Sequence, residues 1–187
     1  MPNWCNNDIT LKHKDPAMIE RAAKAMAAGS FLNEFFPCPP ELHEHPSPMR
    51  DEALASRFLA EYGATDWYNW QVNNWGTKWD IGGDDGLMQK LDDNTLQASF
   101  DSAWAPPCEA YEKLIELGFY IKAYYNEPGM AFCGVWEGDK ENGFFDDYCE
   151  YSDTDSTTVR EAIGAELDDF YGISETMAEY EGENEDE

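Results

Sequence analysis

Side chains of the kind that bind transition metals occur close together in one stretch of the chain. Cys38, His43 and His45 lie in a segment that also contains prolines at positions 37, 39, 40, 46 and 48. A structural zinc site needs four such ligands, usually supplied as two closely spaced pairs. No second pair follows elsewhere in the sequence. We therefore predict a surface loop here, with neither a bound metal nor a cofactor.

The motifs of common enzyme classes are absent from the sequence. The glycine-rich stretch at residues 82–86 has aspartates where a phosphate-binding loop would hold its anion, and no lysine follows at the required position. This stretch and the one that begins at Asp153 each lack a ligand that an EF-hand calcium loop requires. No Gly-x-Ser-x-Gly motif occurs, and the chain has three histidines in all. We predict a protein that is not an enzyme.

Tryptophan is concentrated between residues 67 and 80, which contain four of the seven tryptophans. In one interpretation, Trp70, Trp75 and Trp79 line a pocket that stacks on a nucleobase, and Lys78 binds a phosphate. In the other, Trp75 and Trp79 belong to the core or cover the sheet, and polar neighbours satisfy backbone groups in a sharp turn. We favour the structural interpretation and keep nucleotide or small-signal binding as an alternative function.

Acidic side chains dominate the last quarter of the chain. Residues 141–187 contain seventeen Asp and Glu and one basic residue, Arg160, whereas the whole chain has 39 Asp and Glu and 12 Lys and Arg. This segment contributes −16 to the net charge of −27, and residues 1–140 contribute −11. Such charge disfavours a compact state through self-repulsion. It also excludes nucleic acid and anionic membranes as direct partners, because both carry the same sign, and it indicates a basic partner.

Patterning and capping signals predict the elements that position these groups. Strands are predicted at residues 8–13, 96–101, 119–125, 130–137 and 144–151, where apolar residues alternate or aromatic residues are enriched. Helices are predicted after Asp15, from 51 to 62, before Gly118 and from 159 to 170, the last with a capping box of Thr158 and Glu161. A further strand is predicted around residues 74–81 and a loop at 82–86.

The order of these elements predicts an α+β fold. Strand, helix, two strands, helix and strand follow one another as in the ferredoxin-like unit, which has an antiparallel sheet with helices on one face. We predict one domain at residues 1–172, with a loop and helix insertion at about 30–66 and a C-terminal β-hairpin and helix. Residues 173–187 are predicted to be an acidic, mobile tail.

Three stretches of the sequence are similar to a known family. Residues 1–7 (MPNWCNN), 74–80 (NWGTKWD) and 100–107 (FDSAWAPP) resemble the YubB-type ferredoxin-like domain family of phage and plasmid proteins, over residues 1 to about 137. The resemblance implies a ferredoxin-like fold and an origin in a mobile genetic element. It implies no activity and no catalytic residues, because the function of the family is uncharacterised.

Cysteine usage and hydropathy predict the compartment. No run of 18 apolar residues occurs, and the first residues lack a charged region followed by an apolar stretch. The five cysteines are odd in number and widely spaced, which is typical of free thiols in a reducing compartment. We predict a protein of the host-cell cytoplasm with no membrane partner.

Together these observations predict a non-enzymatic protein that mimics nucleic acid. Carboxylates fixed on helices and strand edges reproduce the charge density of DNA, so a basic groove binds them in place of DNA. For a phage or plasmid protein the predicted partner is a basic nucleic-acid-binding protein of the host, such as a restriction or CRISPR defence complex. The alternative is a general interaction protein whose acidity serves solubility. The predicted partner-binding residues are Asp146, Asp147, Glu150, Asp153, Asp155, Glu161, Glu166, Asp168 and Asp169.

Overall fold

An antiparallel sheet of six strands lies at the centre of the computed structural model, which describes residues 3–83 and 87–185, with side chains as far as Gly182. The strands are β1 (Trp4–Lys12), β2 (Leu87–Asp92), β3 (Thr95–Ala103), β4 (Tyr120–Glu127), β5 (Phe132–Asp139) and β6 (Gly143–Glu150), in the sheet order β2-β3-β1-β4-β5-β6. The α+β class predicted from the sequence is confirmed. Most of the predicted loop at 82–86 and the last two residues of the predicted tail lie outside the described residues.

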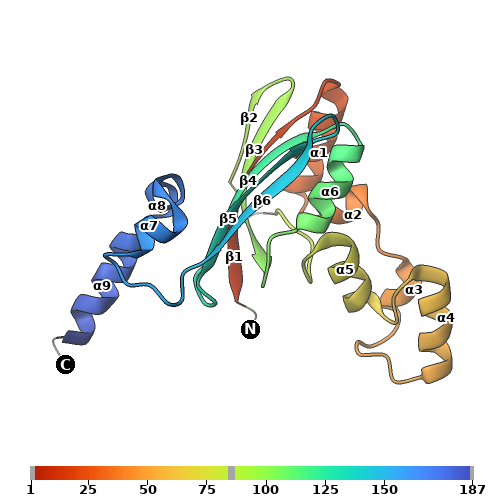
Figure 1. Cartoon of the computed structure of the whole chain (residues 1–187). Coiled ribbons are helices and arrows are strands. Elements are labelled where there is room, and N and C mark those ends of the chain that lie inside the picture. Colours follow the sequence, from red (N-terminus) through yellow and green to blue (C-terminus); the bar gives the residue numbers. More distant parts are fainter. Residues whose placement is uncertain (1–2, 84–86, 186–187) are drawn as a thin grey trace.

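Helices cover both faces of this sheet (Figure 1). On one side lie α1 (Pro16–Ala27), α2 (Phe31–Phe35), α3 (Pro40–His43), α4 (Glu52–Tyr62), α5 (Trp67–Trp75) and α6 (Cys108–Glu116), and on the other lie α7 (Val159–Ile163), α8 (Ala165–Tyr171) and α9 (Ile173–Glu185). None of the described helices is long and apolar enough to span a bilayer.

Strands β4 and β5 contribute to two separate hydrophobic cores. The main core, under α1 and α6, contains Ala123 and Trp136, which are neighbours in the β4–β5 pairing. The second core contains Val135, which pairs with Tyr124, and the apolar residues of α7, α8 and α9 pack against it. Successive side chains in a strand point to opposite faces, so the two cores follow from alternation along the same two strands.

Capping residues delimit two helices as the sequence predicted. The Asp15 carboxylate accepts a hydrogen bond from the Ala17 amide (2.9 Å) at the start of α1. Asp51 does the same for the amides of Ala53 and Leu54 at the start of α4, and Gly63 ends that helix in the left-handed conformation (φ 75°). Glycine adopts this conformation without the steric cost that a side chain imposes.

The strand predicted around residues 74–81 is wrong, because helix α5 extends to Trp75 and residues 76–81 form no strand. Asp66 caps the start of α5 and Gly76 ends it in the left-handed conformation (φ 85°). The corresponding strand of the sheet is β2, at Leu87–Asp92. All six residues of β2 are exposed, so no alternation of apolar and polar residues marked it in the sequence.

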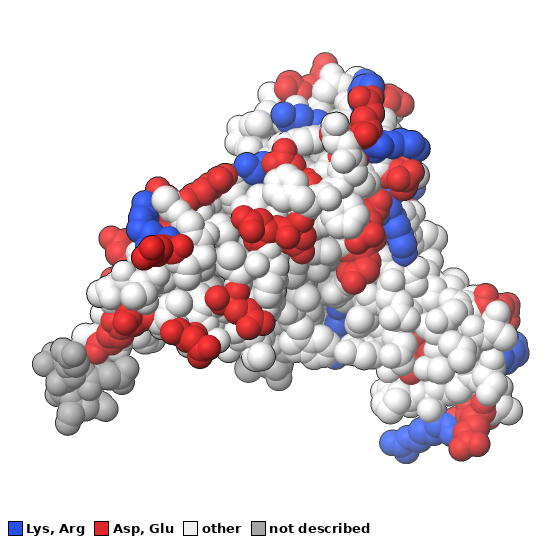
Figure 2. All heavy atoms as spheres, viewed as in Figure 1, with Lys and Arg blue, Asp and Glu red and all other residues white. Residues whose placement is uncertain are grey.

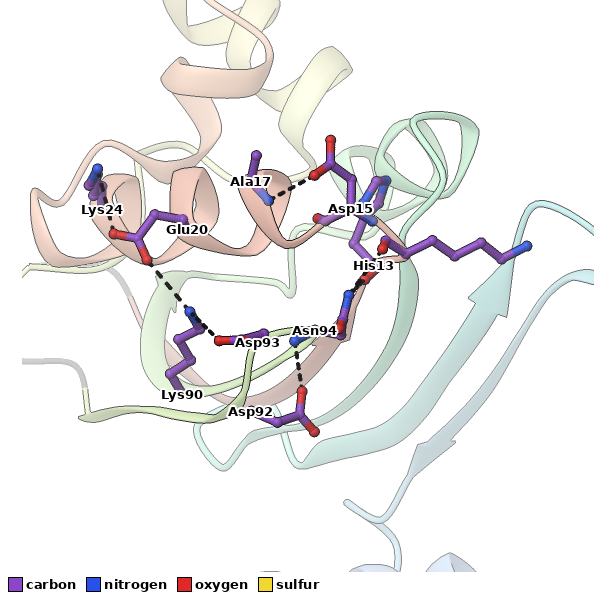
Figure 3. A network of polar contacts seen from close by, with 10 residues as sticks. His13, Asp15, Ala17, Glu20, Lys24, Lys90, Asp92, Asp93 and Asn94 are labelled. Carbon is purple, nitrogen blue, oxygen red and sulfur yellow. Dashed lines mark hydrogen bonds and ion pairs between the residues drawn. The ribbon is translucent and has the colours of Figure 1, made fainter.

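Polar contacts attach the edge strand β2 to the rest of the molecule (Figure 3). Lys90 Nζ lies 3.7 Å from a carboxylate oxygen of Glu20 on α1 and 3.5 Å from Asp93. At the turn into β3, the Asn94 side chain donates to the backbone oxygens of His13 (2.7 Å) and Lys14 (3.1 Å). The β2–β3 turn is thereby joined to the connection between β1 and α1.

The C-terminal segment also differs from its prediction. Gly164 (φ 84°) divides the helix expected at residues 159–170 into α7 and α8. The predicted capping box is wrong, because Thr158 makes no side-chain cap and the Asp155 carboxylate accepts from the Thr157 and Thr158 amides instead (both 3.0 Å). Where the sequence predicted a mobile tail, residues 173–185 form α9.

Asp66 is the buried acidic residue on which the tryptophan-rich helix depends. Its side chain is 1% exposed and accepts hydrogen bonds from Ser47 Oγ (3.1 Å), the Met49 amide (3.4 Å), and both the amide (3.0 Å) and side chain (2.9 Å) of Asn69. Burial opposes ionisation, but these donors together hold the pKa of Asp66 below its ordinary value. The ionised carboxylate therefore stabilises the fold.

We predict that Asp66→Ala lowers the free energy of unfolding by about 2 kcal/mol at pH 7, because it leaves several donors without a partner. The folded-state pKa is lowered, so the loss is complete above about pH 4 and shrinks as the pH falls through the folded-state value. Urea denaturation of both proteins across this range measures it. Asp51→Ala, which removes an exposed cap, is the control, and an equal loss in the two variants would contradict the account.

Candidate functional site

The acid-rich segment is held against the sheet by the second core. Val159, Ile163, Leu167 and Ile173 are buried together with Cys133 and Val135 of β5. The Phe170 ring of α8 also stacks on Tyr124 of β4, with centroids 4.6 Å apart. Apolar contacts of this kind stabilise the folded segment in proportion to the surface they remove from water. The carboxylates of α7–α9 are therefore displayed by an ordered support.

Asp146 and Asp147 point to opposite faces of the sheet. Asp146 is opposite Trp136, on the face of the main core, and Asp147 is opposite Val135, on the face of the second core. The Tyr125 hydroxyl donates to Asp146 (2.6 Å), and burial raises the pKa of this carboxylate. Strand β6 thus divides its predicted partner-binding residues between two surfaces.

A partly buried ion pair connects α7 and α8, and the same carboxylate joins them to α9. Asp168 is 3% exposed and accepts hydrogen bonds from Arg160 Nη1 (2.8 Å) and from the Ser174 amide and hydroxyl (both 2.8 Å). Burial opposes ionisation, but the Ser174 and Arg160 donors hold the pKa of Asp168 below its ordinary value. Asp169 accepts from the same guanidinium nitrogen (2.6 Å) and is exposed. Arg160, the one basic residue in this segment, thus stabilises the packing of these helices.

Two more of the predicted residues have local structural contacts. Glu166 accepts a hydrogen bond from the Tyr124 hydroxyl and lies 3.2 Å from Lys122 Nζ, and these donors lower its pKa. It therefore links α8 to β4. Asp155 organises the turn before α7, and the hydroxyl and amide donors of Thr157 and Thr158 lower its pKa.

The remaining predicted residues are exposed and are not neutralised. Asp147, Asp153 and Glu161 form no ion pair or side-chain hydrogen bond with another described residue, and Glu150 accepts only from the Tyr148 hydroxyl (2.9 Å). Figure 2 shows acidic side chains spread over β6 and the C-terminal helices, with uncharged surface between them.

Glu175 and Glu179 add to this negative surface, although the sequence analysis did not single them out. Both are exposed on α9, one helical turn apart, and neither has a cationic partner among the described residues. Their i, i+4 spacing was visible in the sequence, but it was assigned to a mobile tail. Glu150, which is opposite Phe132, faces the side of the main core as Asp146 does. We refer to the other five unpaired residues, Asp147, Asp153, Glu161, Glu175 and Glu179, as the acidic surface.

The four residues of the alternative ligand pocket do not come together. Trp75 is 1% exposed and donates from Nε1 to the Phe36 backbone oxygen (2.9 Å), and the Trp70 ring contacts it edge-on, 5.9 Å between centroids. These two rings belong to the main core. Lys78 and Trp79 lie beyond the end of α5, and Trp79 is exposed.

The cysteine and histidine residues of the proline-rich stretch also make separate structural contacts. Cys38 is buried, and burial raises its pKa to about 12. His43 stacks on Trp67 (5.9 Å between centroids), whereas His45 contacts Phe58 (5.5 Å). Among the described residues, no group of three or more His, Cys, Asp and Glu side chains could hold a metal ion.

A cleft of about 690 Å³ opens at the end of the sheet near the β1–α1 connection. It contains Lys12, Lys14 and Lys140, but acidic side chains oppose two of these lysines. Lys14 lies 3.6 Å from Glu141, and Lys140 lies 3.4 Å from Glu116. The mixed charge gives this cleft no clear preference for an anion or a cation.

No protein-family model and no curated protein matches the chain. Among solved structures, protein api92 from Yersinia pseudotuberculosis, of the DUF1281 family model, is similar at a TM-score of 0.46 and 12% identity, over 81% of this chain and 99% of that one.

We predict that Asp168→Ala destabilises the packing of α7–α9 by about 2 kcal/mol, because Arg160 and the Ser174 amide lose a buried acceptor. The tryptophans all precede residue 137. Tryptophan fluorescence should therefore change little, whereas proteolysis within residues 151–182 should accelerate. Asp169→Ala removes the exposed carboxylate on the same guanidinium and is the matched control. Equal proteolysis of the two variants would contradict the structural role of Asp168.

Proposed function

We propose that this chain is a non-enzymatic protein that binds a basic, nucleic-acid-binding protein of the host cell in place of nucleic acid. The observation that carries the proposal is the acidic surface, whose carboxylates lack cationic partners among the described residues. Three of its five residues lie on helices α7 and α9, and the second core and the paired carboxylates Glu166 and Asp168 fix the helical segment in place. A fixed array of negative charge steers a cationic groove at long range and binds it more tightly than a flexible tail does.

Two further features support this proposal. Burial raises the pKa of Cys5, Cys38, Cys108, Cys133 and Cys149, which disfavours a thiolate nucleophile at neutral pH. The net charge of −27 favours a partner of opposite sign. If the chain comes from a phage or plasmid, as its resemblance to the YubB-type family implies, a restriction or CRISPR defence complex in the cytoplasm is a partner of suitable charge.

We also infer that the strands β4-β1-β3-β2 form a ferredoxin-like unit with α1 and α6. The strand order and the position of α1 after β1 and α6 after β3 support this interpretation. In this interpretation, α2–α5 are an insertion, and β5, β6 and α7–α9 are an extension that carries the acidic surface.

We predict that the immobilised chain retains basic proteins from an extract of its natural host, that double-stranded DNA displaces them, and that binding weakens steeply between about 50 mM and about 200 mM salt. The variant Asp147→Lys/Asp153→Lys/Glu161→Lys should bind the retained protein about tenfold more weakly at low salt, because it reverses unpaired charges. Binding of the purified partner is measured by calorimetry.

A second triple variant separates a specific surface from general acidity. Glu44→Lys/Glu61→Lys/Glu112→Lys changes the net charge equally, at exposed carboxylates outside the acidic surface. It should bind nearly as the unaltered chain does. The proposal of nucleic-acid mimicry would be contradicted if both variants bound the partner equally weakly, or if DNA failed to displace the partner from the chain.

A further inference from the structure

Three aromatic side chains lie around one lysine, and a fourth packs against them, at the end of the sheet where β1 begins and β3 ends. Lys78 Nζ lies 4.5 Å from the centroid of Trp79, 5.2 Å from that of Trp104 and 6.0 Å from that of Tyr68. Trp4 contacts Trp79 (5.8 Å between centroids), and Tyr68 contacts Trp104 edge-on (6.0 Å). We call these five residues the aromatic corner.

Buried hydrogen bonds hold the parts of the aromatic corner in place. Thr77 is 1% exposed, and its hydroxyl bonds both the backbone oxygen (3.0 Å) and the amide (3.1 Å) of Ala103 at the end of β3. The Trp104 amide donates to the Asn3 oxygen (3.0 Å). Trp104 also has a positive φ (71°), which is unfavourable for a bulky side chain, and strained backbone conformations of this kind cluster at functional sites. The corner is therefore rigid before any ligand arrives.

The residues of the string at 74–80 separate into those that build the fold and those that face outward. Asn74 accepts a hydrogen bond from Lys113 Nζ (2.6 Å), and Trp75 fills the core. Asp80 accepts from the amides at the start of α2 and from its own neighbour. Lys78 and Trp79 take part neither in these hydrogen bonds nor in the core. Their described contacts are those of the aromatic corner.

Large apolar rings remain in contact with solvent here. Trp4, Trp79 and Trp104 are 45%, 39% and 41% exposed. Tryptophans that are fixed in position and left open to solvent are typical of binding sites, where a ligand covers them.

Lys78 is a cation without an acidic partner in a very acidic protein. Eight of the 12 Lys and Arg residues form ion pairs with carboxylates, but Lys78 does not, and its ammonium group has no hydrogen-bond acceptor among the described residues. Its position over the rings of Trp79 and Trp104 leaves its N–H donors available to an incoming anion.

We propose that the aromatic corner binds a small nucleotide, whose base covers the exposed indoles and whose phosphate accepts hydrogen bonds from Lys78. Rings and an ammonium group together match a ligand that is both planar and anionic. The net charge of −27 repels a polyanion along its whole length, whereas a single nucleotide interacts with charges within about one Debye length, roughly 8 Å at physiological salt. The expected ligand is therefore a mononucleotide or dinucleotide.

The test is calorimetric titration of the full-length chain with AMP, GMP, CMP and UMP, and with adenosine and inorganic phosphate separately. We expect at least one mononucleotide to bind, the corresponding nucleoside to bind about tenfold more weakly, and phosphate alone not to bind measurably. Lys78→Met keeps the alkyl stem and removes the charge, so it should abolish the difference between nucleotide and nucleoside. Lys140→Met, at a lysine outside the corner, should bind as the unaltered chain does.

A measurement on the unaltered chain makes the test independent of how the variants fold. Addition of the nucleotide should shift the indole N–H resonances of Trp4, Trp79 and Trp104, while those of the buried Trp75 and Trp136 stay in place. The proposal is overturned if no mononucleotide binds at millimolar concentration, if Lys78→Met binds it unchanged, or if a single-stranded oligonucleotide binds more tightly than the mononucleotide. None of these results depends on the acidic surface, so this inference stands or fails separately from the proposed function.

Discussion

Strands β4 and β5 are buried on both faces, and this constraint determines where the acidic segment lies. Trp136 faces the main core and Cys133 the second core, and both are fully buried. Leaving the second face in water would cost roughly 25 cal/mol for each Å² of apolar surface. Helices α7–α9 cover that face, and they carry the densest negative charge in the chain. Hydrophobic burial thus opposes the self-repulsion that would otherwise extend this segment.

The carboxylates of the segment fall into two groups, those that are paired with a cation and those that are not. Glu166 and Asp168 use the two nearby cations, Lys122 and Arg160, and so fix α8 to β4 and to its neighbouring helices. Asp153 and Glu161 have no such partner among the described residues. The supporting contacts are partly buried, whereas the unpaired carboxylates are exposed. Salt should therefore weaken the proposed partner binding more than it weakens the fold.

Local signals predicted the elements well where side chains alone define them. Asp15, Asp51 and Gly63 marked the ends of helices, and alternation marked β3 and β4. The same signals around α5, Asp66 before it and Gly76 after it, were present but were outweighed by its aromatic content. Strand β2 could not be predicted from alternation, since both of its faces are exposed and its position depends on pairing with β3.

The candidate site was predicted less completely, for a reason of geometry. Adjacency in a strand implies that Asp146 and Asp147 face opposite sides, so their separation was available from the sequence. The pairing of Asp168 with Arg160 and Ser174 required the turns at Gly164 and Gly172, and the aromatic corner required three distant segments to meet.

The most direct test of the account is amide hydrogen exchange of the whole chain. We expect the amides of α7–α9 to be protected from exchange together with those of β5. If the amides of α7–α9 instead exchanged at the rate of an unstructured peptide, the account of an ordered acidic surface would be contradicted.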